Sequence, residues 1–135
     1  MSSAVPYPTE GSSTVSSTTG GDELLTVFVL HAAEGHVLTV VGEADLHTAP
    51  RLRRELIAAL VLAPPSVLVE LGALEFCDLQ GLDALHDVAQ VARDLDVAIT
   101  FRGMSRLLTM MDREFPPADP AQSLTGSRSP DPHWA

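Results

Sequence analysis

The sequence predicts an α/β protein in which helices pack on a mixed β-sheet, and three observations lead to this fold class. Short β-branched and apolar runs alternate with segments whose apolar residues recur every three or four positions. The first two apolar runs are joined by a short turn that contains glycine, which is typical of an antiparallel hairpin. The resulting order, β-β-α-β-α-β-α, favours a mixed sheet because each later strand is reached through a helix.

The hairpin is predicted for residues 24–42. Residues 24–32 form the first apolar and β-branched run, and residues 36–42 (HVLTVVG) form the second. The turn between them is Ala33-Glu34-Gly35. We therefore expect these two strands to pair antiparallel at the start of the sheet.

A first helix is predicted to begin at Thr48, because threonine is a favourable N-cap and Pro50 suits the first turn. Its apolar stripe is Leu52, Leu56, Ala59 and Leu60, and Arg51, Arg54 and Glu55 are expected on the other, solvent-facing side. Pro64 and Pro65 end the helix.

The second half of the domain repeats the alternation of strand and helix. Residues 66–71 (SVLVEL) are nearly all apolar, as in a strand covered on both faces, and residues 72–80 are predicted to be a loop. A second helix is predicted from Gly81, with Leu82, Leu85, Val88, Ala89 and Ala92 inward and Asp83, Asp87, Gln90 and Arg93 in solvent. Residues 97–101 form the last strand, and residues 105–114 form a last helix with the stripe Leu107, Leu108, Met111 and Phe115.

A length of 135 residues predicts a single domain flanked by two tails. Residues 1–22 are rich in Ser, Thr and Gly, and we expect a disordered arm because such a segment buries too little apolar surface. Residues 23–115 are predicted to be the folded domain. Residues 116–135 are rich in proline and are predicted to be a second disordered tail, with Trp134 near its end.

Charge and composition exclude several classes of function. The sequence has 18 acidic and 8 basic residues, so its net charge of -10 opposes direct binding to nucleic acid or to anionic membranes. It contains no lysine for Schiff-base or P-loop chemistry. The N-terminus lacks the features of a signal peptide, and no apolar run is long enough to span a membrane. With its single cysteine, the chain is expected to be cytoplasmic.

Candidate chemical groups are few, and we expect neither catalysis nor a cofactor. His31, His36 and His47 lie near the hairpin, but nothing else supplies the spacing of metal ligands, so no metal is predicted. Cys77 precedes a helix and is either a small buried hydrophobic residue or a redox-sensitive thiol. Asp45 and Asp78 each lie between a strand and a helix, and they are either turn and cap residues or a pair of acid–base carboxylates. An enzyme of this kind would need a deep pocket between the two loops.

Two motifs in this order resemble the STAS domain of bacterial anti-sigma factor antagonists. The first is GEADLHTAPRLRREL (residues 42–56), and the second is VLVELGALEFCDLQGLDAL (residues 67–85). The family pattern is roughly G-E-(I/L)-D-x-x-(T/N)-(A/V)-x-x-(L/F), then an apolar strand, then (F/V)-x-D-S-(S/T)-G-(L/I). The resemblance covers about residues 24–115 and implies a STAS-like fold with an N-terminal hairpin.

The resemblance also implies regulation by partner switching. A STAS antagonist binds an anti-sigma factor of the histidine-kinase-like ATPase type, which then releases its sigma factor. The anti-sigma factor reverses this by phosphorylating the second hydroxyl residue of D-S-(S/T)-G. This sequence has Asp78-Leu79-Gln80-Gly81 instead, so both hydroxyl positions are lost and Gln80 occupies the acceptor position.

Two functions are compatible with that departure. The chain either binds an anti-sigma factor without the usual switch, or it is a STAS accessory subunit of an ABC-type lipid transport system, which needs no phosphoserine. Control by Cys77 or by the Ser/Thr-rich arm is a further possibility, whereas Thr48 and Ser105 are expected to be helix caps. The implied contact surface comprises Asp45, His47, Thr48, Asp78, Leu79, Gln80, Gly81, Leu82, Asp83, His86 and Asp87. Its acidity suits a partner with a basic groove, and Leu79 would be an apolar anchor.

Overall fold

The computed structural model describes residues 13–16, 24–117, 119, 123 and 124. The elements are β1 (Ser13–Ser16), β2 (Leu25–His31), β3 (His36–Ala44), α1 (Ala49–Leu60), β4 (Ser66–Cys77), α2 (Leu79–Asp94), β5 (Ala98–Arg102) and α3 (Arg106–Glu114). From β2 onward this order confirms the predicted one. β1 lies inside the arm predicted to be disordered, so that prediction is wrong for residues 13–16; the rest of the arm lies outside the described residues.

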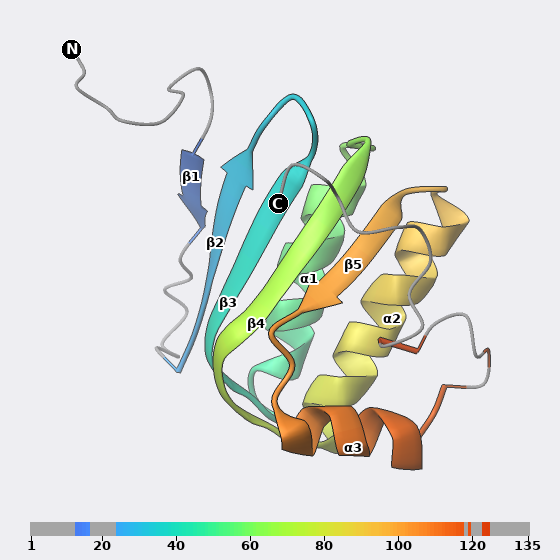
Figure 1. Ribbon diagram of the computed structural model, residues 1–135. Helices are drawn as coiled ribbons and strands as arrows, with labels where there is room; N and C mark the ends of the chain where they lie inside the picture. Colours follow the sequence, from blue (N-terminus) through green and yellow to red (C-terminus); the bar gives the residue numbers. More distant parts are fainter. Residues whose placement is uncertain (1–12, 17–23, 118, 120–122, 125–135) are drawn as a thin grey trace.

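The strands form one mixed sheet in the order β1-β2-β3-β4-β5. The β2–β3 hairpin is antiparallel, as predicted, and β1 adds to β2 in the same sense. β4 and β5 each join parallel to the preceding strand after a helical crossover. Figure 1 shows α1 and α2 on the same face of this sheet, with α3 across one end of the molecule. Among the described residues, no helix combines the length and apolar character needed to cross a bilayer.

The β4 strand is twice as long as the sequence predicts. The loop expected at residues 72–80 is wrong for residues 72–77, which continue β4 beside the end of β3. Two register shifts in the β3–β4 pairing, opposite Thr39–Val41 and opposite Gly42–Glu43, each place one extra residue on β4. Bulges of this kind leave no clear alternation in the sequence. As a result α2 begins at Leu79, two residues earlier than predicted.

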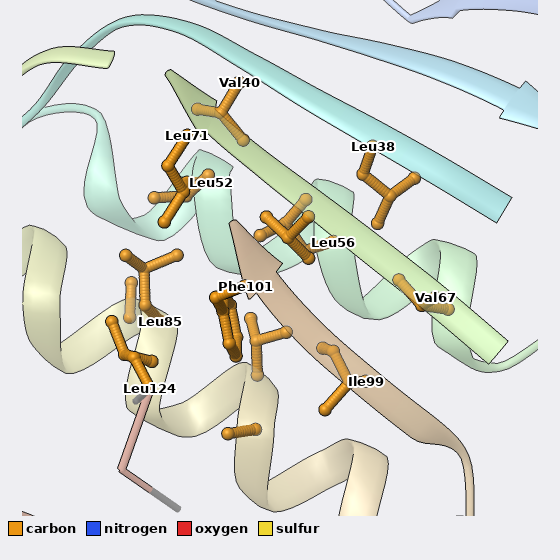
Figure 2. Packing of buried hydrophobic residues seen from close by; sticks show 14 of the residues in the cluster. Leu38, Val40, Leu52, Leu56, Val67, Leu71, Leu85, Ile99, Phe101 and Leu124 are labelled. Atoms are coloured by element: carbon orange, nitrogen blue, oxygen red, sulfur yellow. The ribbon is translucent and has the colours of Figure 1, made fainter. Parts of the chain in front are cut away.

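The core lies between the sheet and the two helices and is almost wholly aliphatic. Figure 2 shows Leu38 and Val40 of β3, Leu52 and Leu56 of α1 and Leu85 of α2 in this layer. The predicted stripes of α1 and α2 are confirmed, because their members are buried. The stripe predicted for α3 is wrong at Leu107 and Phe115, which are exposed, whereas Leu108 and Asp112 face inward.

Two residues predicted to lie in solvent are part of the interior. Arg51 is buried, and its guanidinium donates a hydrogen bond to the backbone carbonyl of Leu25 at the start of β2. Apolar periodicity alone does not reveal this burial, because it assigns a charged side chain to solvent. Leu124, from the tail predicted to be disordered, is 1% exposed and belongs to the core (Figure 2). The folded part therefore extends beyond the predicted boundary at residue 115, while Trp134 lies outside the described residues.

Candidate functional site

The two predicted motifs meet at one edge of the sheet, where β3 and β4 end side by side. Ala44 pairs with Cys77 in the parallel register, and the backbone N–H of Asp78 donates to the carbonyl of Ala44 at 3.0 Å. The chain leaves β3 into the loop that precedes α1 and leaves β4 directly into α2. Asp45 and Asp78 therefore follow neighbouring strands at the same edge, as the parallel crossovers require.

The Asp45 carboxylate holds the turn that leads into α1. Its Oδ1 accepts the backbone N–H groups of His47 at 2.9 Å and Thr48 at 3.0 Å. The hydrogen bond from the Thr48 amide is the largest cause of the lowered pKa of Asp45. The Thr48 hydroxyl donates to the carbonyl of Glu43 at 2.8 Å and accepts from the Asp45 N–H. Thr48 stands at the N-cap position, as predicted, but its side chain fastens the turn and does not cap α1.

Asp78 is the N-cap of α2. Its Oδ1 accepts the backbone N–H groups of Gln80 at 2.9 Å and Gly81 at 3.0 Å, which satisfies donors that a helix start leaves unpaired. Asp45 and Asp78 thus each serve the local backbone, which favours the turn and cap interpretation over an acid–base pair. Within the described part of the chain, no three metal-ligating side chains come together.

Gly81 allows α2 to begin directly against the sheet. A Cβ at this position would lie 2.6 Å from the carbonyl oxygen of Ala44, 2.7 Å from the Ala44 side chain and 2.9 Å from the Cys77 sulfur. Real Cβ atoms do not approach other atoms this closely, so glycine is required for this packing. The close approach fixes where the exposed residues before Gly81 are presented.

The structure divides the predicted contact surface into exposed and buried members. Exposed or half-exposed residues are Asp45, His47, Asp78, Leu79, Gln80, Asp83 and Asp87. The other members, Thr48, Gly81, Leu82 and His86, are buried, which agrees with the inward position predicted for Leu82 in the α2 stripe. Leu82 and His86 are four residues apart and share the inner face of α2. They therefore pack beneath the exposed members of the contact surface.

His86 forms a buried polar cluster that the sequence does not predict. Its Nε2 lies 2.8 Å from Oδ1 of Asp112 on α3, and both side chains are almost fully buried. Asp112 also accepts the Ser123 hydroxyl at 2.8 Å and the backbone N–H of Leu124 at 3.2 Å. The cluster therefore joins α2, α3 and the segment at residues 123–124. A buried Asp on an amphipathic helix resembles a solvent-facing one in sequence, so no signal pointed to it.

A hollow lies between the start of α2 and the end of α3. It has a volume of about 320 Å³, is open to solvent, and is lined by Leu79, Gln80, Leu82, Asp83, His86, Phe115 and Pro116. Five of these residues belong to the contact surface predicted from the sequence. Phe115 and Pro116 are not part of that surface, because the sequence predicts Phe115 in the α3 stripe and Pro116 in the tail. We call this feature the α2–α3 hollow.

Cys77 lines a smaller cavity of about 80 Å³ between β4 and α3. Burial is the main cause that raises the pKa of its thiol to about 12, and the neighbouring Asp78 carboxylate adds to it. The thiol is therefore protonated at neutral pH, and the half-buried Cys77, which packs against the core, fits a small hydrophobic residue better than a redox-sensitive thiol.

We expect Cys77 to react slowly with a soluble aromatic disulfide reagent at pH 8. Thiolate is the reacting form, so the native thiol should react about a hundredfold or more slowly than the same thiol in denaturant. Because the pKa is raised, the native rate should still be rising at pH values where the denatured rate has levelled. The absorbance of the released thiol measures both rates. Equal rates in buffer and in denaturant would contradict the raised pKa and the partly buried position of Cys77.

Comparison with known proteins shows the family to which the chain belongs. A family model described as "Mlab, STAS domain" matches residues 28–114, so the chain belongs to the STAS-domain family. This confirms the resemblance and the STAS fold expected from the two motifs. A search of curated proteins finds no match.

Among solved structures, the chain is similar to anti-sigma factor antagonists. One from Mycobacterium paratuberculosis is 28% identical over 78% of this chain and 95% of that chain, with a TM-score of 0.53. Unphosphorylated SpoIIAA is 18% identical over 66% of this chain and 80% of its own, with a TM-score of 0.52. Phosphorylated SpoIIAA of Bacillus is 14% identical over 67% and 83%, with a TM-score of 0.55. The two SpoIIAA structures support the fold alone.

Proposed function

We propose that the chain is an anti-sigma factor antagonist-like regulator. It binds an anti-sigma factor of the histidine-kinase-like ATPase type in the cytoplasm and so releases a sigma factor, without the usual serine phospho-switch. The observation that carries the proposal is the start of α2, where Leu79 and Gln80 stand exposed at the two hydroxyl positions of the family motif. The similarity to the Mycobacterium paratuberculosis antagonist supports the same role.

The start of α2 is built for contact and offers no group to phosphorylate. Neither Leu79 nor Gln80 carries a hydroxyl, and the backbone N–H groups of Gln80 and Gly81 already donate to Asp78. A helix start can stabilise an added phosphate, but the exposed residues at this one carry no hydroxyl group to receive it. A kinase partner would therefore be bound without being able to turn the antagonist off.

The charge of the chain suits a protein partner with a basic surface. A net charge of -10 favours fast association with such a partner and opposes binding to nucleic acid. The two motif carboxylates hold the backbone at the helix starts, so we propose a binding module without catalytic turnover and without a cofactor.

The test is calorimetric binding to the histidine-kinase-like anti-sigma factors of the same genome, with ADP and with ATP. We expect wild type to bind with equal affinity in both nucleotides. Gln80→Ser places a hydroxyl at an exposed position in the first turn of α2, and we expect this variant to be phosphorylated and released with ATP. Mass spectrometry of the variant detects the added phosphate. Release of wild type by ATP would contradict the loss of the switch.

The loss of both hydroxyl residues also favours one other function, that of a STAS accessory subunit of an ABC-type lipid transport system. Such a subunit binds an ATPase and needs no phosphoserine. Co-purification with a transporter ATPase, together with no binding to any kinase-type anti-sigma factor, would establish this function and reject the first.

A further inference from the structure

We propose that the α2–α3 hollow receives an apolar side chain of the anti-sigma factor that is flanked by an arginine or lysine. This inference rests on the proposed function and names the chemistry of the contact. The juxtaposition that carries it is an apolar rim of Leu79 and Phe115 beside the carboxylate of Asp83 (Leu79, Asp83 and Phe115 all line the hollow).

The rim and floor of the hollow expose apolar surface to solvent. Leu79 at the start of α2 is 47% exposed, and Phe115 at the end of α3 is 53% exposed. Leu82 forms the buried floor and Pro116 continues the wall. Large half-exposed apolar side chains around a concavity mark contact sites, and the hollow has a volume of about 320 Å³. A leucine, methionine or phenylalanine side chain would cover this surface.

Asp83 gives the hollow its charge. It is exposed, and the lining includes no arginine. One turn further along α2, Asp87 accepts from Arg53 at 2.9 Å, so that acidic group is already paired. The imidazole of His86, which also lines the hollow, contacts the Asp112 carboxylate at 2.8 Å. Asp83 is thus the carboxylate placed to meet a cation on the partner, and charged pairs of this kind raise association rates.

The walls of the hollow are held in place before any partner binds. α2 and α3 are joined by the buried contact between His86 and Asp112 at 2.8 Å. Asp112 also accepts from Ser123 and Leu124, so the end of α3 that leads to Phe115 is tied both to α2 and to these two residues. A site held in its bound shape loses less conformational entropy on association, which favours a specific contact here.

The experiment measures the affinity of the full chain for a kinase-type anti-sigma factor by calorimetry and its association rate by stopped flow. The test variants are Leu79→Ser and Asp83→Arg. Each has a control on the same helix. Leu95→Ser removes a leucine of similar exposure, 42% against 47%, at the other end of α2, about 24 Å away at 1.5 Å per residue. Asp94→Arg makes the same change of charge there.

We expect Leu79→Ser and Asp83→Arg each to weaken binding at least about tenfold, and both controls to change it less than about threefold. Asp83→Arg should act mainly by slowing association, with a shallower dependence on salt. If wild type binds but the two test variants bind equally well, the contact at the hollow is rejected while the proposed function stands. If wild type binds no such anti-sigma factor, both fall. Equal losses in test and control variants would also overturn the inference, because they would indicate a general effect of charge or apolar area.

Discussion

Gly81→Ala is expected to lower the free energy of unfolding by about 1–3 kcal/mol, although alanine is the better helix former. The added Cβ would lie 2.6 Å from the Ala44 carbonyl oxygen and 2.9 Å from the Cys77 sulfur. The first of these atoms is backbone and cannot move without shifting the end of β3. The cost of this clash exceeds the roughly 1 kcal/mol that alanine contributes to helix propensity.

Urea unfolding of Gly81→Ala measures this effect, and the chain offers a matched control in Gly72→Ala. Gly72 lies in β4, and a Cβ built there meets no atom within 4 Å. We expect Gly72→Ala to be neutral or slightly stabilising, because it only restricts the unfolded chain. If the two variants were equally stable, the first turn of α2 would not pack on Ala44 as described.

The surroundings of Gly81 show which features of this site could be predicted from the sequence and which could not. The spacing of apolar residues located both crossovers, and parallel pairing then required Asp45 and Asp78 to share an edge. The residues of the second motif could therefore be assigned to one surface. The approach of α2 to Ala44 could not be predicted, because it depends on β4 extending to Cys77 through register shifts that produce no periodic pattern.

Buried polar groups account for most of the differences between prediction and structure. Arg51, His86 and Asp112 are polar residues on amphipathic helices, and periodicity assigns polar residues to solvent. Each is buried with a partner from a distant part of the chain: Arg51 with a backbone carbonyl of β2, and His86 with Asp112. Pairing across such separations is a tertiary property, so a single sequence without its fold cannot show it. The same holds for Leu124, whose partners belong to the core.

Leu124→Ala is expected to lower the free energy of unfolding by about 2–4 kcal/mol, the usual cost of removing a buried leucine side chain. Leu124 is 1% exposed within the core cluster, and its backbone N–H donates to the Asp112 carboxylate at 3.2 Å. Loss of the side chain leaves a cavity and loosens the segment that helps to satisfy that buried carboxylate. Urea unfolding measures the change, and Leu62→Ala is the control because Leu62 is 62% exposed.

The same substitution tests whether the residues after 115 are part of the folded domain. Leu124 and Ser123 both bond to Asp112, and Phe115 and Pro116 lie between that anchor and the end of α3. If this anchor holds the wall of the α2–α3 hollow, Leu124→Ala should weaken binding to the anti-sigma factor in the folded protein, and Leu62→Ala should not. A Leu124→Ala protein as stable as Leu62→Ala would show that residues after 115 are not part of the folded domain. The boundary expected from composition alone would then be the correct one.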